Sequence, residues 1–227
     1  MTWLLLLGGV FLLALFLYWL LVTTEGVYLG RRVVVWLYDL TAHKYDAIKA
    51  YEEGDEQLLV TRPVLAAIGR RTEPLLLDVA TGTGRVPFDL LQAPTFSGHV
   101  VGLDHSVRML AIARRKLAPY CGRVSLVLHP AVPLPFPDAR FDAVTCLEAL
   151  EFLPSDAAAL AEMVRVLRPG CYLFTTRRRG WEGKAFLHRY RSRDKMCASL
   201  QRLGLQEIRF HPWQVNYDLV TARKPFL

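Results

Sequence analysis

The chain begins with an uninterrupted apolar segment. From Trp3 to Val22 every residue is apolar, aromatic or glycine, and the first charged side chain is Glu25. Twenty helical residues, at a rise of about 1.5 Å each, span about 30 Å, the thickness of the hydrocarbon core of a bilayer. The pattern therefore predicts one N-terminal transmembrane helix, and we assign residues 1–24 to an anchor.

A cleaved secretory signal peptide is the alternative interpretation of this segment. It would have basic residues before the apolar run, a shorter run and a small-x-small cleavage site. Here no Lys or Arg precedes the run, and residues 21–24 (Leu-Val-Thr-Thr) make a poor cleavage site. We therefore expect a retained, single-pass anchor. Because Arg31 and Arg32 follow it, the positive-inside rule predicts that the rest of the chain faces the cytoplasm.

Residues 25–54 are predicted to form juxtamembrane or lid helices. Trp36 and Tyr38 belong to an apolar run that begins at Val33–Val35. Aromatic side chains of this kind favour a helix lying along the membrane surface. An ordinary amphipathic helix packed on the following domain fits the same pattern.

Beyond residue 55, short apolar runs alternate with amphipathic stretches. Helical spacing of apolar residues covers 55–68, 106–117 and 156–167, and strand-length apolar runs cover 75–79, 100–103, 124–128, 141–147, 172–175, 205–211 and 215–222. Continuous apolar strands separated by helices are typical of a parallel sheet covered on both faces. The last two runs have no helix between them, which predicts an antiparallel pair. We expect one α/β domain over residues 55–227.

Charge and cysteine usage limit the classes of protein. Of the net charge of +7, residues 177–195 carry +6, from eight basic and two acidic side chains. A basic cluster of this kind can meet nucleic acid, an anionic membrane or an anionic substrate. The four cysteines are scattered without a CxxC pair, so we expect no metal site, no disulfide framework and a reducing compartment.

The strongest chemical signal follows the apolar run 75–79. That run contains Asp78 and leads into Ala80-Thr81-Gly82-Thr83-Gly84, after which a helical pattern begins. Glycines at such a point let the backbone turn tightly and approach a ligand at the start of a helix. The dinucleotide fingerprint G-x-G-x-x-G fails, because its third glycine would fall on Pro87. An acidic Asp78 also disfavours a pyrophosphate and suits a ligand with a cationic amino group.

A second carboxylate ends the next strand. Asp104 follows Val100-Val101-Gly102-Leu103, and a carboxylate at such a strand tip can accept hydrogen bonds from both hydroxyls of a ribose. Asp104 or Ser106 could instead cap the helix that follows.

Five segments of the chain occur in an order typical of one enzyme class. They are 77–84 (LDVATGTG), 102–110 (GLDHSVRML), 134–142 (LPFPDARFD), 148–153 (EALEFL) and 162–170 (EMVRVLRPG). With them the chain resembles the class I S-adenosylmethionine-dependent methyltransferases, especially the small-molecule enzymes of ubiquinone and menaquinone biosynthesis. The resemblance implies a Rossmann-like, seven-stranded, mostly parallel sheet and S-adenosylmethionine as cofactor.

The resemblance also implies roles for individual residues. The methionine part of the cofactor would be held by Asp78, Ala80, Thr81, Gly82 and Gly84, the ribose by Asp104, and the adenine by His105 and Met109, with Leu147 and Glu148 near the methyl group. The sequence departs from the family at Pro130-Ala131, where an Asp-Ala pair usually follows the third strand. Proline offers neither a side-chain acceptor nor an N–H, so the adenine would depend on the Ala131 amide, packing or water.

Catalysis and acceptor are less constrained by the sequence. An oxygen or enol-carbon nucleophile would need a general base, and the resemblance makes Glu148, Glu151 and Tyr45 the candidates. The apolar segment suggests a small, lipophilic or membrane-associated acceptor, with Arg177, Arg178 and Arg179 in a lid that helps select it. Two alternatives are an RNA methyltransferase that uses the basic 177–195 segment, although no RNA-binding motif supports nucleic-acid binding, and a membrane-tethered scaffold that binds cofactor without turnover. The sequence does not indicate an oligomeric state.

Overall fold

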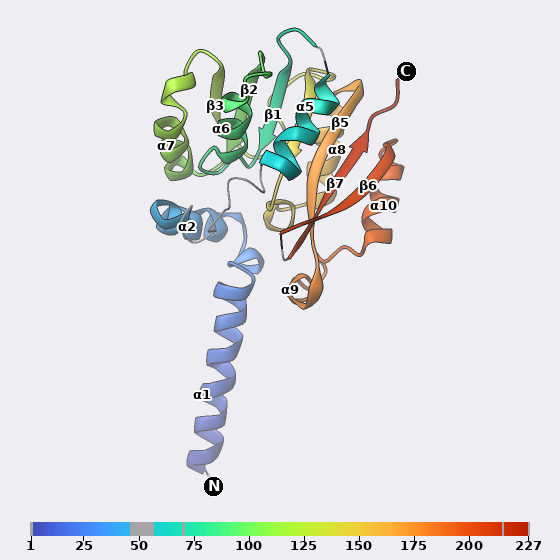
Figure 1. Cartoon of the computed structure of the whole chain (residues 1–227). Coiled ribbons are helices and arrows are strands. Elements are labelled where there is room, and N and C mark those ends of the chain that lie inside the picture. The colour runs from blue at the N-terminus through green and yellow to red at the C-terminus, as the bar shows by residue number, and fades with distance from the viewer. Residues whose placement is uncertain (1, 46–56, 70, 215, 227) are drawn as a thin grey trace.

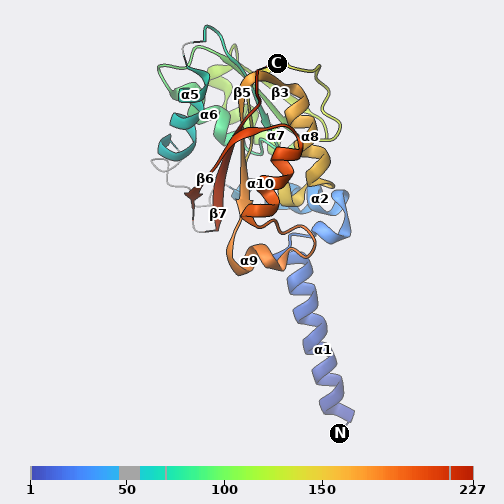
Figure 2. The same ribbon diagram turned by 90° about the vertical axis from the view of Figure 1, so that its right-hand side faces the viewer.

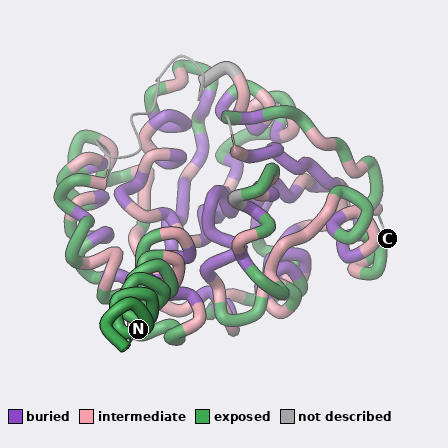
Figure 3. Tube along the Cα trace, turned by 90° about the horizontal axis from the view of Figure 1, so that it is seen from below, coloured by how far each residue is buried: buried purple, intermediate pink, exposed green. Residues whose placement is uncertain are grey.

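The computed structural model describes residues 2–45, 57–69, 71–214 and 216–226. The N-terminal apolar segment forms helix α1 (Thr2–Tyr18), which continues as a π-helical turn over Trp19–Thr23. Together these 22 residues have a mean hydropathy of 2.6 and are long and apolar enough to cross a membrane. The helix projects away from the rest of the molecule (Figure 1), and its residues are exposed (green in Figure 3).

One seven-stranded sheet forms the centre of the molecule, in the order β3-β2-β1-β4-β5-β7-β6. Strands β1 to β5 pair in parallel, whereas β7 is antiparallel to both β5 and β6. The strands are β1 (Leu75–Val79), β2 (His99–Asp104), β3 (Val124–Leu128), β4 (Phe141–Cys146), β5 (Leu167–Arg178), β6 (Gln206–Trp213) and β7 (Tyr217–Arg223). The predicted α/β sheet with an antiparallel C-terminal pair is confirmed.

Helices cover both faces of this sheet. Because successive strand side chains point to opposite faces, β1 places Leu77 and Val79 in one apolar core and Leu76 in the other. The first core includes residues of α8 (Asp156–Val166) and α10 (Arg193–Arg202). The second includes residues of α5 (Arg62–Ile68), α6 (Arg85–Gln92) and α7 (Val107–Lys116). Two helical layers therefore enclose the sheet.

Two segments differ from the predicted elements. The expected helix over 55–68 is a π-helical turn at Gln57–Thr61 followed by α5, and residues 55 and 56 lie outside the described part. Pro63, which has no N–H, stands in the first turn of α5, where that loss costs least. The run predicted to end at Thr175 continues through Arg178, because β5 pairs with β7 up to Arg178–Tyr217.

The N-terminal segment is attached to the domain at two places. Helix α2 (Arg31–Thr41) packs on the carboxyl edge of the sheet, where the Asp39 carboxylate accepts a hydrogen bond from the Ser106 hydroxyl. The end of the α1 segment contacts the chain around α9 (Gly180–Ala185): Trp19 Nε1 donates to Ala185 O at 3.1 Å, and the Tyr28 hydroxyl donates to Leu187 O at 2.6 Å. Helices α2 and α9 thus lie at the end of the domain from which α1 projects (Figures 1 and 2).

Candidate active site

The loop between β1 and α6 has the strained backbone that its glycines predict. Ala80, Gly82 and Gly84 have φ values of 57°, 56° and 80°, in the left-handed region that favours glycine. At Gly84 an added Cβ would meet the Leu117 side chain at 2.9 Å, whereas at Gly82 it would meet no atom within 4 Å. Gly84 is therefore needed for helix packing, and Gly82 borders open space.

Asp78 lies beneath this loop and does not line the cavity described below. Its two carboxylate oxygens accept hydrogen bonds from the hydroxyls of Thr81 and Thr145, each at 2.6 Å. Burial raises the pKa of Asp78 to about 6. Through the bond to Thr81, the Asp78 side chain stabilises the loop. The resemblance had suggested that Asp78 contacts the methionine part of the cofactor.

Asp104 is fixed at the tip of β2 by backbone groups. One carboxylate oxygen accepts from the Gly82 N–H and the other from the Ser106 N–H, both at 2.8 Å. Burial raises the pKa of Asp104. The cap of α7 is Ser106, whose hydroxyl accepts from the Met109 N–H at 3.0 Å. Asp104 therefore joins the glycine loop to β2 at the position where the resemblance places a ribose-binding carboxylate.

A cavity with about 880 Å³ of empty space, including open solvent at its mouth, extends along the carboxyl edge of the sheet. The predicted residues that line it are Ala80, Gly82, Asp104, His105, Met109, Ala131, Leu147, Glu148 and Tyr45. Asp78, Thr81, Gly84, Glu151 and Arg177–Arg179 lie outside its lining.

One end of the cavity is lined by histidines. His105, His129, Pro130 and Ala131 meet there, and His129 Nδ1 lies 2.8 Å from Pro130 O. The Nδ1 atom of His105 is buried without a hydrogen-bond partner among the described residues. Burial, and then Arg31, lower the pKa of His105, which keeps the ring neutral near pH 7. A neutral imidazole with a free ring nitrogen suits an uncharged heterocycle, and so fits an adenine where the usual aspartate is replaced by Pro130.

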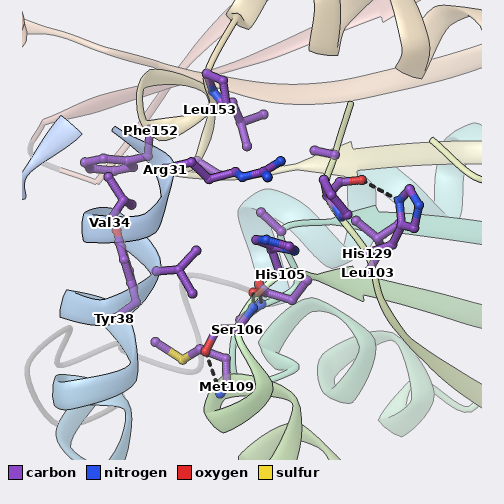
Figure 4. A pocket seen from close by; sticks show the side chains of 18 of the residues that line it. Arg31, Val34, Tyr38, Leu103, His105, Ser106, Met109, His129, Phe152 and Leu153 are labelled. Carbon is purple, nitrogen blue, oxygen red and sulfur yellow. Dashed lines mark hydrogen bonds between the residues drawn. The ribbon is translucent and has the colours of Figure 1, made fainter. Parts of the chain in front are cut away.

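Helix α2 forms the other wall, which sequence reasoning did not identify (Figure 4). It contributes Arg31, Val34, Val35 and Tyr38 to the lining. The Tyr38 ring meets Phe152 edge to face with 5.9 Å between centroids, and its hydroxyl donates to the Glu25 carboxylate at 2.7 Å. The sequence predicted juxtamembrane or lid helices over 25–54, but the run around Trp36 and Tyr38 does not specify which side chains meet the domain.

The two candidate glutamates lie in different places. Glu148 lines the cavity with a left-handed backbone (φ 51°), and its carboxylate accepts from Arg85 at 3.1 Å and Gln214 at 3.3 Å. Glu151 lines a separate, smaller pocket and accepts from the Tyr217 hydroxyl at 2.6 Å. Burial raises the pKa of Glu151. The structure therefore brings Glu148, but not Glu151, into the same cavity as Asp104.

The three consecutive arginines are largely engaged within the domain. Arg177 is buried and pairs with Asp218, and Arg179 lies 3.7 Å from the same carboxylate group. The Arg178 guanidinium stacks over Phe186, 4.8 Å from the ring centroid, and its Nε lies 3.7 Å from Glu151. Asp218 and Glu151 thus lie beside all three arginines and supply two negative charges against the +6 of the segment.

Comparison with known proteins agrees with this geometry. Residues 76–170 match a family described as "Methyltransferase domain". The chain is 41% identical over 97 residues to the ubiquinone/menaquinone biosynthesis C-methyltransferase UbiE of Geobacter sulfurreducens, covering 42% of this chain and 38% of the relative. It is 38% identical over 138 residues to the demethylmenaquinone methyltransferase of Symbiobacterium thermophilum, covering 59% and 54%. The chain thus spans about half the length, or less, of these relatives.

Solved structures share the fold at lower identity. The [4+2]-cyclase SpnF superposes with a TM-score of 0.69 at 19% identity, covering 86% of this chain and 96% of the cyclase. A SAM-dependent methyltransferase from Aquifex aeolicus gives 0.62 at 21% identity, covering 81% and 97%. These likenesses establish the architecture alone, since one fold carries several activities. Residues 76–170 thus match the methyltransferase family, and the solved structures add that the domain has the same architecture.

Proposed function

We propose that this protein transfers a methyl group from S-adenosylmethionine to a lipophilic, quinone-type acceptor. One observation carries the proposal: the cavity joins a polar half at the strand tips to an apolar half made by α2 and Phe152. The named activities of the curated relatives, which act in ubiquinone and menaquinone synthesis, support this acceptor class.

The polar half would hold the cofactor. Gly82 provides space, Asp104 accepts from the ribose hydroxyls, and His105 offers its Nδ1 to the adenine. When bound, S-adenosylmethionine supplies a methyl group already activated by its sulfonium charge, so the protein has mainly to align the reactants and exclude water. Val34 and Phe152, both buried, would exclude water from the acceptor half.

Two residues on the cavity wall, Tyr38 and Glu148, could remove the proton from a hydroxyl group of the quinone-type substrate. Tyr38 can take the proton while passing its own to Glu25, to which it already donates. Burial, with Glu25 beside it, raises the pKa of Tyr38 well above 10, so Tyr38 works as a relay and not as a standing phenolate. Glu148 is the other candidate on the cavity wall. Loss of the hydroxyl proton would leave an electron-rich ring carbon as the nucleophile. The bound cofactor would supply its methyl group to that carbon and leave as the neutral thioether, and the proton of that carbon would be lost as the ring hydroxyl re-forms.

The α1 segment would keep the enzyme on the membrane where such acceptors reside, with residues 1–24 as anchor and the domain on the cytoplasmic side. Its length and hydropathy support this role. The RNA alternative is less favoured, because Arg177 and Arg178 are paired with carboxylates inside the domain.

The test supplies the full chain in vesicles with methyl-labelled S-adenosylmethionine and, in separate reactions, a demethylated quinol and total RNA. We expect label in the quinol alone. Label in RNA would overturn the proposal, and cofactor binding without any labelled product would favour a scaffold.

A further inference from the structure

Exposed apolar side chains gather at one end of the domain. Beyond the α1 segment, the large apolar residues that are exposed in the described part of the chain are Leu29, Trp36, Leu40, Val107, Leu128, Trp181, Leu187 and Phe226. The first three lie on or beside α2, and Trp181 and Leu187 lie on or just after α9. Five of the eight thus belong to the α2 and α9 regions, and both helices lie at the end of the domain from which α1 projects (Figures 1 and 2).

Helix α2 has two distinct faces. Positions 32, 36 and 40 are four residues apart and form one stripe, while positions 34 and 38 lie about 200° around the helix from 36. Trp36 and Leu40 are 57% and 43% exposed, whereas Val34 and Tyr38 line the cavity. A single helix, about 10 Å thick, therefore separates the cavity from an apolar outer surface.

The α9 region has a matching outer surface. Trp181 is 74% exposed and Leu187 52%, and the exposed Lys184 lies between them. The hydrogen bonds from Trp19 and Tyr28 fix this region to the end of α1. Tryptophan beside basic side chains is the composition that suits the headgroup region of an anionic bilayer, and Arg31 and Arg32 are exposed at the start of α2.

We propose that the outer stripe of α2, with Trp181 and Leu187, inserts into the bilayer surface, and that the acceptor enters the cavity directly from the lipid. This inference rests on the proposed function and deepens it, by assigning the route of the acceptor. The occupant of the surface is lipid and not a protein, because α1 is long and apolar enough to cross a bilayer and leaves the domain at this same end. A bilayer around α1 would meet both helices at once.

The first test places a fluorescent reporter at single cysteines in the full chain, with Cys121 and Cys197 replaced by Ser. The chain is reconstituted into phosphatidylcholine vesicles with about one-third phosphatidylglycerol and a nitroxide-labelled lipid as quencher. We expect strong quenching at Leu4→Cys, Trp36→Cys and Trp181→Cys, but not at Phe226→Cys, which is exposed at the opposite end (Figure 1).

Each other outcome has a definite meaning. Quenching at position 4 alone would support the α1 anchor but overturn this inference, because α2 and α9 would then not contact the lipid. Quenching at none of the four would overturn both the anchor and the inference. Quenching at position 226 as well would mean adsorption without orientation, which also contradicts it.

The second test measures the route. The double variant Trp36→Ser/Leu40→Ser should lose about tenfold or more in kcat/KM with a long-tailed quinol in vesicles, and nothing with a short-tailed, water-soluble quinol. Phe226→Ser serves as the matched control. An equal loss with both acceptors would overturn the route, whereas inactivity of the wild type toward both acceptors would count against the proposed function itself.

Discussion

The two halves of the cavity are built in different ways. In the cofactor half, backbone groups fix the geometry: the N–H groups of Gly82 and Ser106 hold Asp104, and the loop keeps its shape through positive φ angles. In the acceptor half, side chains from distant segments meet, as where Tyr38 of α2 packs on Phe152 and bonds to Glu25. The first half depends mainly on backbone geometry at two adjacent strand ends, and the second on side-chain packing between distant segments, so each should respond differently to substitution.

The largest effect should follow from filling the cofactor half. Gly82→Val places a branched side chain in open space at a φ that disfavours it, and we expect loss of detectable S-adenosylmethionine binding by calorimetry. Gly69→Val is the matched control, because Gly69 also has a positive φ and no neighbour within 4 Å, but lies at the end of α5. Equal loss in both variants would mean that backbone strain, and not lost ligand space, is responsible.

In the acceptor half, Tyr38→Phe and Glu25→Gln should each lower kcat by about 100-fold, the lower range for a lost proton-transfer group. Affinity for S-adenosylmethionine should stay unchanged, because neither residue belongs to the cofactor half. Single-turnover rates and calorimetry separate the two quantities. A loss of cofactor affinity with unchanged kcat would contradict this prediction, because Tyr38 would then contribute to cofactor binding and not to proton transfer.

Removal of the strand-tip carboxylate should have a smaller effect. Asp104→Ala leaves two backbone N–H groups and the ligand hydroxyls without their acceptor, which costs about 1–3 kcal/mol of binding free energy. Asp104→Asn retains an acceptor and should lose less. Wild-type affinity in the alanine variant would exclude Asp104 from the cofactor site.

The smallest effect is the contribution of Asp78 to the pH dependence of the free energy of unfolding. Burial raises the pKa of Asp78 from 3.8 to about 6 in the folded protein, so between these values the native state binds the extra proton. Stability from this group therefore grows as pH falls from 7 to 5, by about 1 kcal/mol. Denaturant unfolding at both pH values should show this increment in the wild type and its absence in Asp78→Asn. The same pH dependence in both proteins would refute the assignment.

The same contrast explains what could be predicted from sequence. Strand β1, the glycine loop and Asp104 were predictable because buried apolar runs and turn residues act over a few neighbouring positions. The positions of α2 and Glu25 were not, because they depend on where an amphipathic helix docks on the sheet edge, as in the contact of Asp39 with Ser106, 67 residues later. Asp78 and Arg177, which the sequence assigned to ligands, also have partners on other strands, Thr145 and Asp218, that only the folded sheet brings near.

The most direct test of the central claim, that one cavity holds cofactor and acceptor side by side, uses Val34→Trp. Val34 is buried on α2 and lines the cavity next to Tyr38. With labelled S-adenosylmethionine and a short-tailed demethylated quinol, we predict methyl transfer by the wild type and none by the variant, which still binds cofactor with wild-type affinity. Undiminished transfer in Val34→Trp, or loss of cofactor binding in a folded variant, would contradict the account.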